Sequence, residues 1–169
     1  MRLFIATQTG AALKAELLRI QKQMRISGVT GSYTAEQNLH MTLAFIGEYD
    51  DPEKVISAIR ASEPEPAAVT LCGIGAFGDL YYAALDADRA LYGNAARLRR
   101  ALDSLGIPYD KKKFKPHITL IRRAVNAAEL PAAKAVTDAV TRTVLMRSDR
   151  TPRGMVYTVI GSCDHKETV

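Results

Sequence analysis

The segments His40-Met41-Thr42-Leu43 and His117-Ile118-Thr119-Leu120 repeat one phrase, His-x-Thr-Leu, at two distant places in the chain. The chain has three histidines, and two of them begin this phrase. Thirteen of the 169 residues are threonine, so two such matches by chance are rare, and the leucine in both makes them rarer still. The repeat therefore indicates two equivalent positions in one folded unit, each combining an imidazole with a hydroxyl.

Both phrases lie in short apolar runs, 39–46 and 114–121, which predict β-strands. Side chains alternate between the two faces of a strand, so residues two positions apart project together. His40 and Thr42 are therefore expected on one face and the intervening Met41 in the core. The second run repeats this arrangement, which predicts two imidazole–hydroxyl pairs on rigid elements.

The rest of the chain predicts a mixture of strands and helices. Apolar periodicity and turn residues indicate strands over 2–7, 67–77, 80–85, 141–146 and 155–160, and helices over 10–25, 50–62 and 88–105. Residues 28–38 resemble a loop, and Pro131 interrupts any helix over 126–136. Hairpins together with helical connections favour an α+β fold with mainly antiparallel sheet. Because no linker divides the chain, one domain over residues 1–169, with two similar lobes, is expected.

Composition narrows the class of protein only slightly. The 47% hydrophobic content supports a real core, and the net charge of +5 suits a polyanionic partner such as RNA without requiring one. The lysines at 111–113 favour a solvated charged turn over a dedicated site. The chain has two cysteines without metal-binding spacing and no apolar run of membrane-spanning length. These features predict a cytoplasmic protein that does not enter membranes.

Two histidines facing each other across a cleft suit acid–base chemistry on a phosphodiester. One imidazole can take a proton from the attacking oxygen while the other gives one to the leaving oxygen. Two histidines without a cysteine or carboxylate set make a poor zinc site, so no metal and no other cofactor is expected. Arg122 is a candidate phosphate ligand, but in a regular strand it would point away from His117 and Thr119. His165 lacks the motif and is expected in a solvated tail.

At these residues the chain resembles the 2H phosphoesterase superfamily, which is named for its two His-x-[Ser/Thr]-x motifs. More narrowly it resembles the RNA 2′,3′-cyclic phosphodiesterases, also called 2′-5′ RNA ligases, at residues 2–6, 36–47, 114–122 and 154–157. The resemblance implies a bilobal α+β fold, in which two pseudo-two-fold-related lobes of antiparallel sheet, with helices outside, enclose a central cleft. It also implies metal-independent hydrolysis of RNA 2′,3′-cyclic phosphate ends to 2′-phosphates. We expect the protein to act as a monomer.

The same resemblance assigns roles to the motif residues. His40 would be the proton donor to the departing 3′ oxygen, and His117 the proton acceptor that activates water. The symmetry of the two motifs leaves the opposite order open. Thr42, Thr119 and Arg122 would bind the phosphate.

Several alternatives remain open at this level. The substrate could be a 2′,5′-linked oligonucleotide or a small cyclic nucleotide, and Tyr49 or Tyr157 could stack on its base. A further hypothesis is a non-catalytic module that binds RNA ends, although such a module has no need for two titratable groups. The segment 126–140 has the least family-like sequence, and its role is open.

Overall fold

The computed structural model describes residues 1–167, whose strands form one nine-stranded sheet with antiparallel pairing throughout. The strands are β1 (Arg2–Gln8), β2 (Thr30–Tyr33), β3 (His40–Glu48), β4 (Ala67–Phe77), β5 (Leu80–Ala87), β6 (His117–Val125), β7 (Thr137–Val140), β8 (Arg142–Thr151) and β9 (Gly154–Asp164). The helices are α1 (Ala11–Ile26), α2 (Pro52–Ala61) and α3 (Arg89–Ser104), and a short 3-10 turn, η1, covers Glu36–Asn38.

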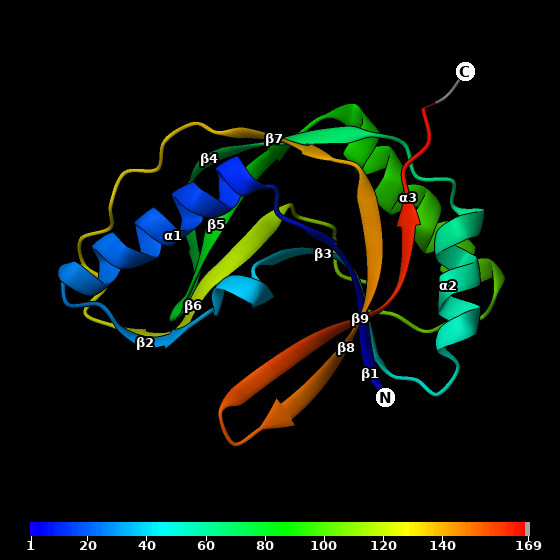
Figure 1. Cartoon of the computed structure of the whole chain (residues 1–169), viewed down its shortest axis with the longest axis horizontal. Helices are drawn as coiled ribbons and strands as arrows, with labels where there is room; N and C mark the ends of the chain where they lie inside the picture. Colours follow the sequence, from blue (N-terminus) through cyan, green and yellow to red (C-terminus); the bar gives the residue numbers. More distant parts are fainter. Residues whose placement is uncertain (168–169) are drawn as a thin grey trace.

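The two motif strands lie side by side at the centre of this sheet. The strand order is β7-β4-β5-β6-β3-β1-β8-β9, and β2 adds to β6 (Figure 1). Met41 of β3 pairs with Ile118 of β6, so the residue after each motif histidine faces its counterpart. β1 flanks β3 as β5 flanks β6. The predicted α+β fold is therefore confirmed, and its two lobes are halves of one continuous sheet.

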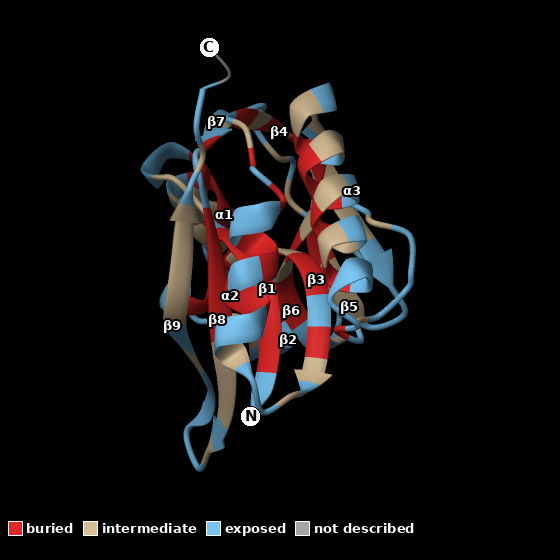
Figure 2. Ribbon diagram, turned by 90° about the vertical axis from the view of Figure 1, so that its right-hand side faces the viewer, coloured by how far each residue is buried: buried red, intermediate tan, exposed pale blue. Residues whose placement is uncertain are grey.

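The helices are divided between the two halves of the sheet. In Figure 1, α1 lies over the half that contains β4, β5 and β6, whereas α2 and α3 lie together on the other side. Helix α1 buries one apolar stripe. Figure 2 shows that β1 is largely buried, whereas α3 is buried only in part. Helices α2 and α3 begin at aspartates that cap them: Asp51 accepts from Lys54 N at 3.0 Å, and Asp88 accepts from Leu91 N at 3.0 Å.

The central strand β1 is buried on both faces. Leu3 and Ile5 belong to the main core beneath the helices. Phe4 and Ala6 point to the opposite face, where they form a second apolar cluster with two residues of β8, and Tyr157 of β9 packs against it. This second cluster lies on the face that carries His40, since the ring centroids of Phe4 and His40 are 4.8 Å apart.

The structure differs from the sequence-based prediction mainly in its short strands. The segment 28–38, predicted as loop, contains β2 and η1, and the four residues of β7 were not predicted. Neither strand shows an apolar alternation, because most of their residues are exposed and each is held by pairing with a longer strand. β6 begins at His117, three residues later than predicted. Within residues 1–167, no helix is long and apolar enough to cross a membrane.

The prediction that His165 lies in a solvated tail is wrong. Its Nε2 lies 2.8 Å from Thr143 Oγ1, and its Nδ1–H donates to the Val140 carbonyl at 3.0 Å. Its backbone N–H also donates to the carbonyl of Thr141. Burial lowers the pKa of His165 below 6.5. This histidine therefore fastens the end of β9 to the sheet.

Candidate active site

The two motif histidines are held in the same way. His40 Nδ1–H donates to the carbonyl of Asn38 at 2.6 Å, and His117 Nδ1–H donates to the carbonyl of Lys115 at 2.6 Å. In each case the acceptor lies two residues before the histidine. A hydrogen on Nδ1 leaves Nε2 of the neutral ring as the atom that can accept a proton. Each Nε2 is therefore the ring atom that remains able to accept a proton.

His40 is enclosed by aromatic side chains. Its ring lies 4.8 Å from the Phe4 ring and 5.2 Å, edge to face, from the Tyr157 ring. Its Nε2 lies 3.1 Å from Thr42 Oγ1. Burial is the main reason that its pKa is lowered below 6.5, and the positive charges of Arg122 and His117 lower it further. At neutral pH in the free protein, His40 is therefore mainly uncharged.

His117 has a parallel environment that also contains a cation. Its ring lies 5.3 Å from the Tyr82 ring and 6.0 Å from the Phe77 ring, both edge to face. Lys115 Nζ donates to the Tyr82 hydroxyl at 2.7 Å and lies 4.9 Å from the centre of the Phe77 ring. A positive charge is therefore fixed against the aromatic rings that contact His117.

Each motif strand contains a bulge, which changes the face of the sheet on which the later side chains of that strand lie. Along β1–β3, Ala6 pairs with Thr42 but Ile5 pairs with Ala44, and a corresponding shift occurs between β5 and β6. Leu43 and Leu120 are thus the additional residues, and each is followed by another buried residue. Beyond each bulge the alternation of side chains is inverted.

In a regular strand Arg122 would point away from His117 and Thr119, but the inverted alternation brings it to their face. Arg122 is exposed on the face of His117 and Thr119, and its charge acts on the pKa of His40. The equivalent position of the first motif carries Phe45, which is also exposed. The two halves of the site therefore differ at this position: one presents a guanidinium and the other an aromatic ring.

Helix α1 holds the second bulge in place. The buried side chain of Gln21 donates from Nε2 to the carbonyls of Leu120, at 3.0 Å, and Thr34, at 2.9 Å. Thr34 N also donates to the Leu120 carbonyl at 2.9 Å. A polar residue on the apolar face of the helix is the signal in the sequence that could have predicted this contact.

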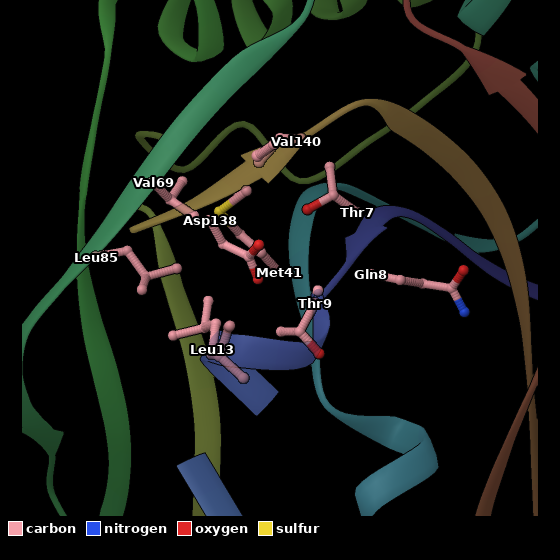
Figure 3. Close-up of a pocket in the computed structure, with 12 residues that line it drawn as sticks. Thr7, Gln8, Thr9, Leu13, Met41, Val69, Leu85, Asp138 and Val140 are labelled. Atoms are coloured by element: carbon pink, nitrogen blue, oxygen red, sulfur yellow. The ribbon is translucent and has the colours of Figure 1, made fainter. Parts of the chain in front are cut away.

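Two cavities flank the motif strands on opposite faces. One has a volume of about 310 Å³ and contains Thr42 and His117 among its lining residues. The other, of about 10 Å³, lies under Met41 and Ile118, where Thr9 Oγ1 and Asp138 Oδ2 are buried without a hydrogen-bond partner among residues 1–167 (Figure 3). The smaller volume suits one water molecule, so of these two cavities the one on the histidine face has room for a nucleotide.

The remaining predicted residues fall into two groups. Thr119 pairs with Tyr82 beside His117, and Tyr157 packs on His40 itself. Tyr49 lies beyond the far end of β3 and packs against the main core, so the structure does not bring it to the histidines. The site also contains four residues that the motifs do not predict, because neighbouring strands and loops bring them there: Phe4, Asn38, Phe77 and Lys115. Residues 1–167 contain no cluster of three or more His, Cys, Asp or Glu that could hold a metal ion.

A pseudo-symmetric antiparallel sheet with two His-x-Thr pairs at its centre defines the class of the 2H phosphoesterases. The family model of the 2′-5′ RNA ligase superfamily matches residues 14–151, and the chain belongs to this family.

Curated relatives and solved structures agree with this assignment. The RNA 2′,3′-cyclic phosphodiesterase of Thermus thermophilus is 31% identical over 95% of this chain and 88% of that protein, and that of Thermotoga maritima is 27% identical over 96% and 95%. The crystal structure of TT0787 of T. thermophilus has a TM-score of 0.87 at 28% identity and covers 99% of both chains. E. coli LigT complexed with 3′-AMP has a TM-score of 0.81 at 27% identity and covers 98% of both.

Proposed function

We propose that this protein hydrolyses RNA 2′,3′-cyclic phosphate ends to 2′-phosphates, with His40 and His117 as the acid–base pair. The observation that carries the proposal is the matched geometry of the two imidazoles, each fixed at Nδ1 by the carbonyl two residues earlier, on adjacent strands. The relatives' activity on RNA 2′,3′-cyclic phosphates supports it, as does the 3′-AMP complex of E. coli LigT.

This geometry supports the following reaction. One neutral imidazole takes a proton from water as the water oxygen bonds to phosphorus. The bond from phosphorus to the 3′ oxygen breaks, and the other imidazole, in its charged form, gives that oxygen a proton. Thr42 and Thr119 donate to the non-bridging oxygens, and Arg122 stabilises the charge that develops there. No step in this sequence requires a metal ion.

The order of the two histidines can be tested separately. The family resemblance makes His40 the donor, whereas its lowered pKa favours the acceptor role before substrate binds. A bound phosphate opposes this preference, since its negative charge stabilises an imidazolium. A p-nitrophenyl phosphodiester decides the order, because its leaving group needs no proton. The variant that lacks the donor should keep much of its activity on this ester, and the variant that lacks the acceptor should not.

The main experiment is product analysis on a short RNA that ends in a 2′,3′-cyclic phosphate. His40→Ala and His117→Ala should each lower kcat by about 10²–10⁴-fold while the protein still folds. His165→Ala serves as the matched control, since this third histidine lies outside the site. The wild-type rate should survive EDTA. Full turnover by either motif variant would refute the proposal.

The family name also motivates a second candidate substrate, a 2′,5′-linked oligonucleotide. The same two histidines would act on the 2′,5′ phosphodiester. Parallel assays of 2′,5′-linked dimers, small cyclic nucleotides and cyclic-phosphate RNA identify the preferred substrate by kcat/KM. Salt-sensitive binding of RNA ends without any product would instead show a binding module.

A further inference from the structure

The cavity of about 310 Å³ beside His117 has the chemistry of a nucleic-acid site, and we call it the lysine groove. It begins at Thr42 and His117 and leaves the motif strands along the segment 110–115. Its lining includes the cations Arg99, Lys112, Lys113 and Lys115, the aromatic residues Phe45, Phe77 and Phe114, and the carboxylate of Asp110. Its volume lies within the range typical of small-molecule sites.

Hydrogen bonds fix the backbone of the segment 110–115, which forms the wall of the groove that carries the lysines. Asp110 N donates to the Phe45 carbonyl at 2.8 Å, which ties the segment to β3. Arg99 Nη1 of α3 donates to the Lys112 carbonyl at 2.7 Å, and Lys112 N donates to Asp110 Oδ1 at 3.0 Å. The backbone is thus fixed from two sides, and its lysine side chains remain exposed.

The three consecutive lysines are all exposed, as expected of a solvated charged segment, but their surroundings differ. Lys111 Nζ donates to Asp103 Oδ1 at 2.5 Å and lies 3.7 Å from the centre of the Tyr109 ring. Lys112 and Lys113 instead line the groove, where Asp110 offsets part of the charge through a contact of 3.6 Å with Lys112 Nζ. The groove keeps a clear positive excess next to the motif residues.

The two halves of the site also differ in the chemistry of one equivalent position, so they offer different contacts to a bound RNA. Arg122 in the second motif and Phe45 in the first occupy equivalent places after the bulges. Phe45 and Phe77 both line the groove, and both are exposed. Exposed aromatic rings stack on bases, whereas lysines pair with phosphates.

We propose that the lysine groove binds the RNA chain on the 5′ side of the cyclic phosphate. Phe45 and Phe77 contact bases there, and Lys112 and Lys113 pair with the next phosphodiesters. This proposal rests on the proposed function, because a cyclic phosphate between the histidines closes the 3′ end and leaves only the 5′ direction for further nucleotides. The protein therefore prefers oligonucleotides to mononucleotides.

The test compares two double variants that each remove two lysine charges. K112A/K113A alters the groove, and K22A/K54A, whose lysines are exposed on α1 and α2, is the matched control. Both are assayed on cytidine 2′,3′-cyclic phosphate and on a pentanucleotide with the same end. K112A/K113A should lower kcat/KM for the pentanucleotide about tenfold and leave the mononucleotide unchanged. Its slope of log(kcat/KM) against log[salt] should become shallower by about 1.4, since each phosphate contact on a single strand contributes about 0.7.

The outcomes separate this proposal from the proposed function. Equal losses on both substrates, no loss on the pentanucleotide, or an equal loss in K22A/K54A would overturn the assignment of the groove. No turnover of any cyclic phosphate by the wild-type protein would instead overturn the proposed function. In that event, fluorescence anisotropy with a labelled pentanucleotide that ends in a 2′-phosphate still tests the groove, through weaker binding by K112A/K113A alone.

Discussion

Asn38 connects His40 to the hairpin formed by β8 and β9. Its side-chain Nδ2 donates to the carbonyl of Met155 at 2.9 Å, and its own carbonyl accepts the Nδ1–H of His40. Asn38 is buried, and the anchored strand β9 carries Tyr157, whose ring packs edge-on against His40. One residue thus fixes both the orientation of the imidazole and the strand that shields it from water.

Asn38 is therefore expected to be a positioning residue, and Asn38→Ala tests this role. The substitution removes the bond to Met155 and leaves the carbonyl that orients His40. With β9 released, His40 should become better solvated, so its pKa should rise toward 6.5 and kcat should fall about tenfold with little change in KM. An NMR titration of the His40 ring measures the shift. Met155→Ala is the control, because it keeps the accepting carbonyl, and an unchanged titration in Asn38→Ala would contradict the role.

Gly75 makes room for the Tyr82 ring beside His117. The two residues are paired across β4 and β5, and a Cβ at position 75 would lie 2.4 Å from Tyr82 Cζ. Gly75→Ala should therefore displace the ring, together with the Lys115 ammonium that bonds to its hydroxyl, and lower kcat about tenfold.

A double-mutant cycle assigns this effect to the ring. If Gly75→Ala acts by displacing Tyr82, it should cost little in a Tyr82→Ala background, where the obstructing atoms are absent. Two independent losses that multiply in the double variant would show that Gly75 acts by another route. Steady-state kinetics on the cyclic-phosphate substrate provide the four rates.

The sequence predicts the elements that bury a regular apolar pattern. The predicted bounds of β4 match the observed ones, and those of the other long elements agree to within a few residues. This agreement arises because leucine periodicity, the Asp51 and Asp88 caps and the Gly78-Asp79 turn act locally. The exceptions are β8 and β9, which run several residues longer than predicted. The sequence also identifies the two His-x-Thr pairs, since strand alternation alone places both side chains on one face. The merging of the two lobes into one sheet depends on the pairing of Met41 with Ile118, which no local pattern encodes.

The parts of the site that escape prediction depend on register and on contacts distant in sequence. The bulges at Leu43 and Leu120 are register shifts against β1 and β5, and the sequence shows them only as two consecutive apolar residues. Arg122 reaches the histidine face for that reason. Asn38 acts through a carbonyl more than one hundred residues away, so its role becomes visible only in the fold.

Arg122 should contribute to both charge stabilisation and the pH profile. Arg122→Ala is expected to lower kcat/KM about 10²–10³-fold, because the charge that develops on the phosphate loses a cationic partner. It should also raise the pKa of His40, since the Arg122 charge is one of the influences that lower it. The acidic limb of the pH–rate profile reports this shift if His40 is the acceptor.

Arg123→Ala is the matched control for that experiment. Arg123 adjoins Arg122 in β6, but its Nη2 donates to Ser32 Oγ at 2.9 Å on the neighbouring strand. Its loss should leave both kcat/KM and the titration of His40 near the wild-type values. Similar effects from the two arginines would indicate a general loss of positive charge rather than a contact of Arg122 with the phosphate.

The stability of the protein should fall on acidification through the range in which histidines titrate. Burial is the main cause that keeps the pKa values of His40 and His165 below 6.5 in the folded state. Below pH 6.5 the unfolded chain therefore binds more protons than the folded one, and the free energy of unfolding decreases as the pH falls toward the lowered pKa values. Carboxylates such as Glu16, whose pKa is lowered from 4.5 mainly by its hydrogen bonds with Arg19, lose their contribution only at more acidic pH. Thermal unfolding between pH 7.5 and 5 should thus show a falling Tm, and His165→Gln, which cannot titrate, should fall less steeply. The same slope in the wild type and in His165→Gln would exclude a contribution from this histidine.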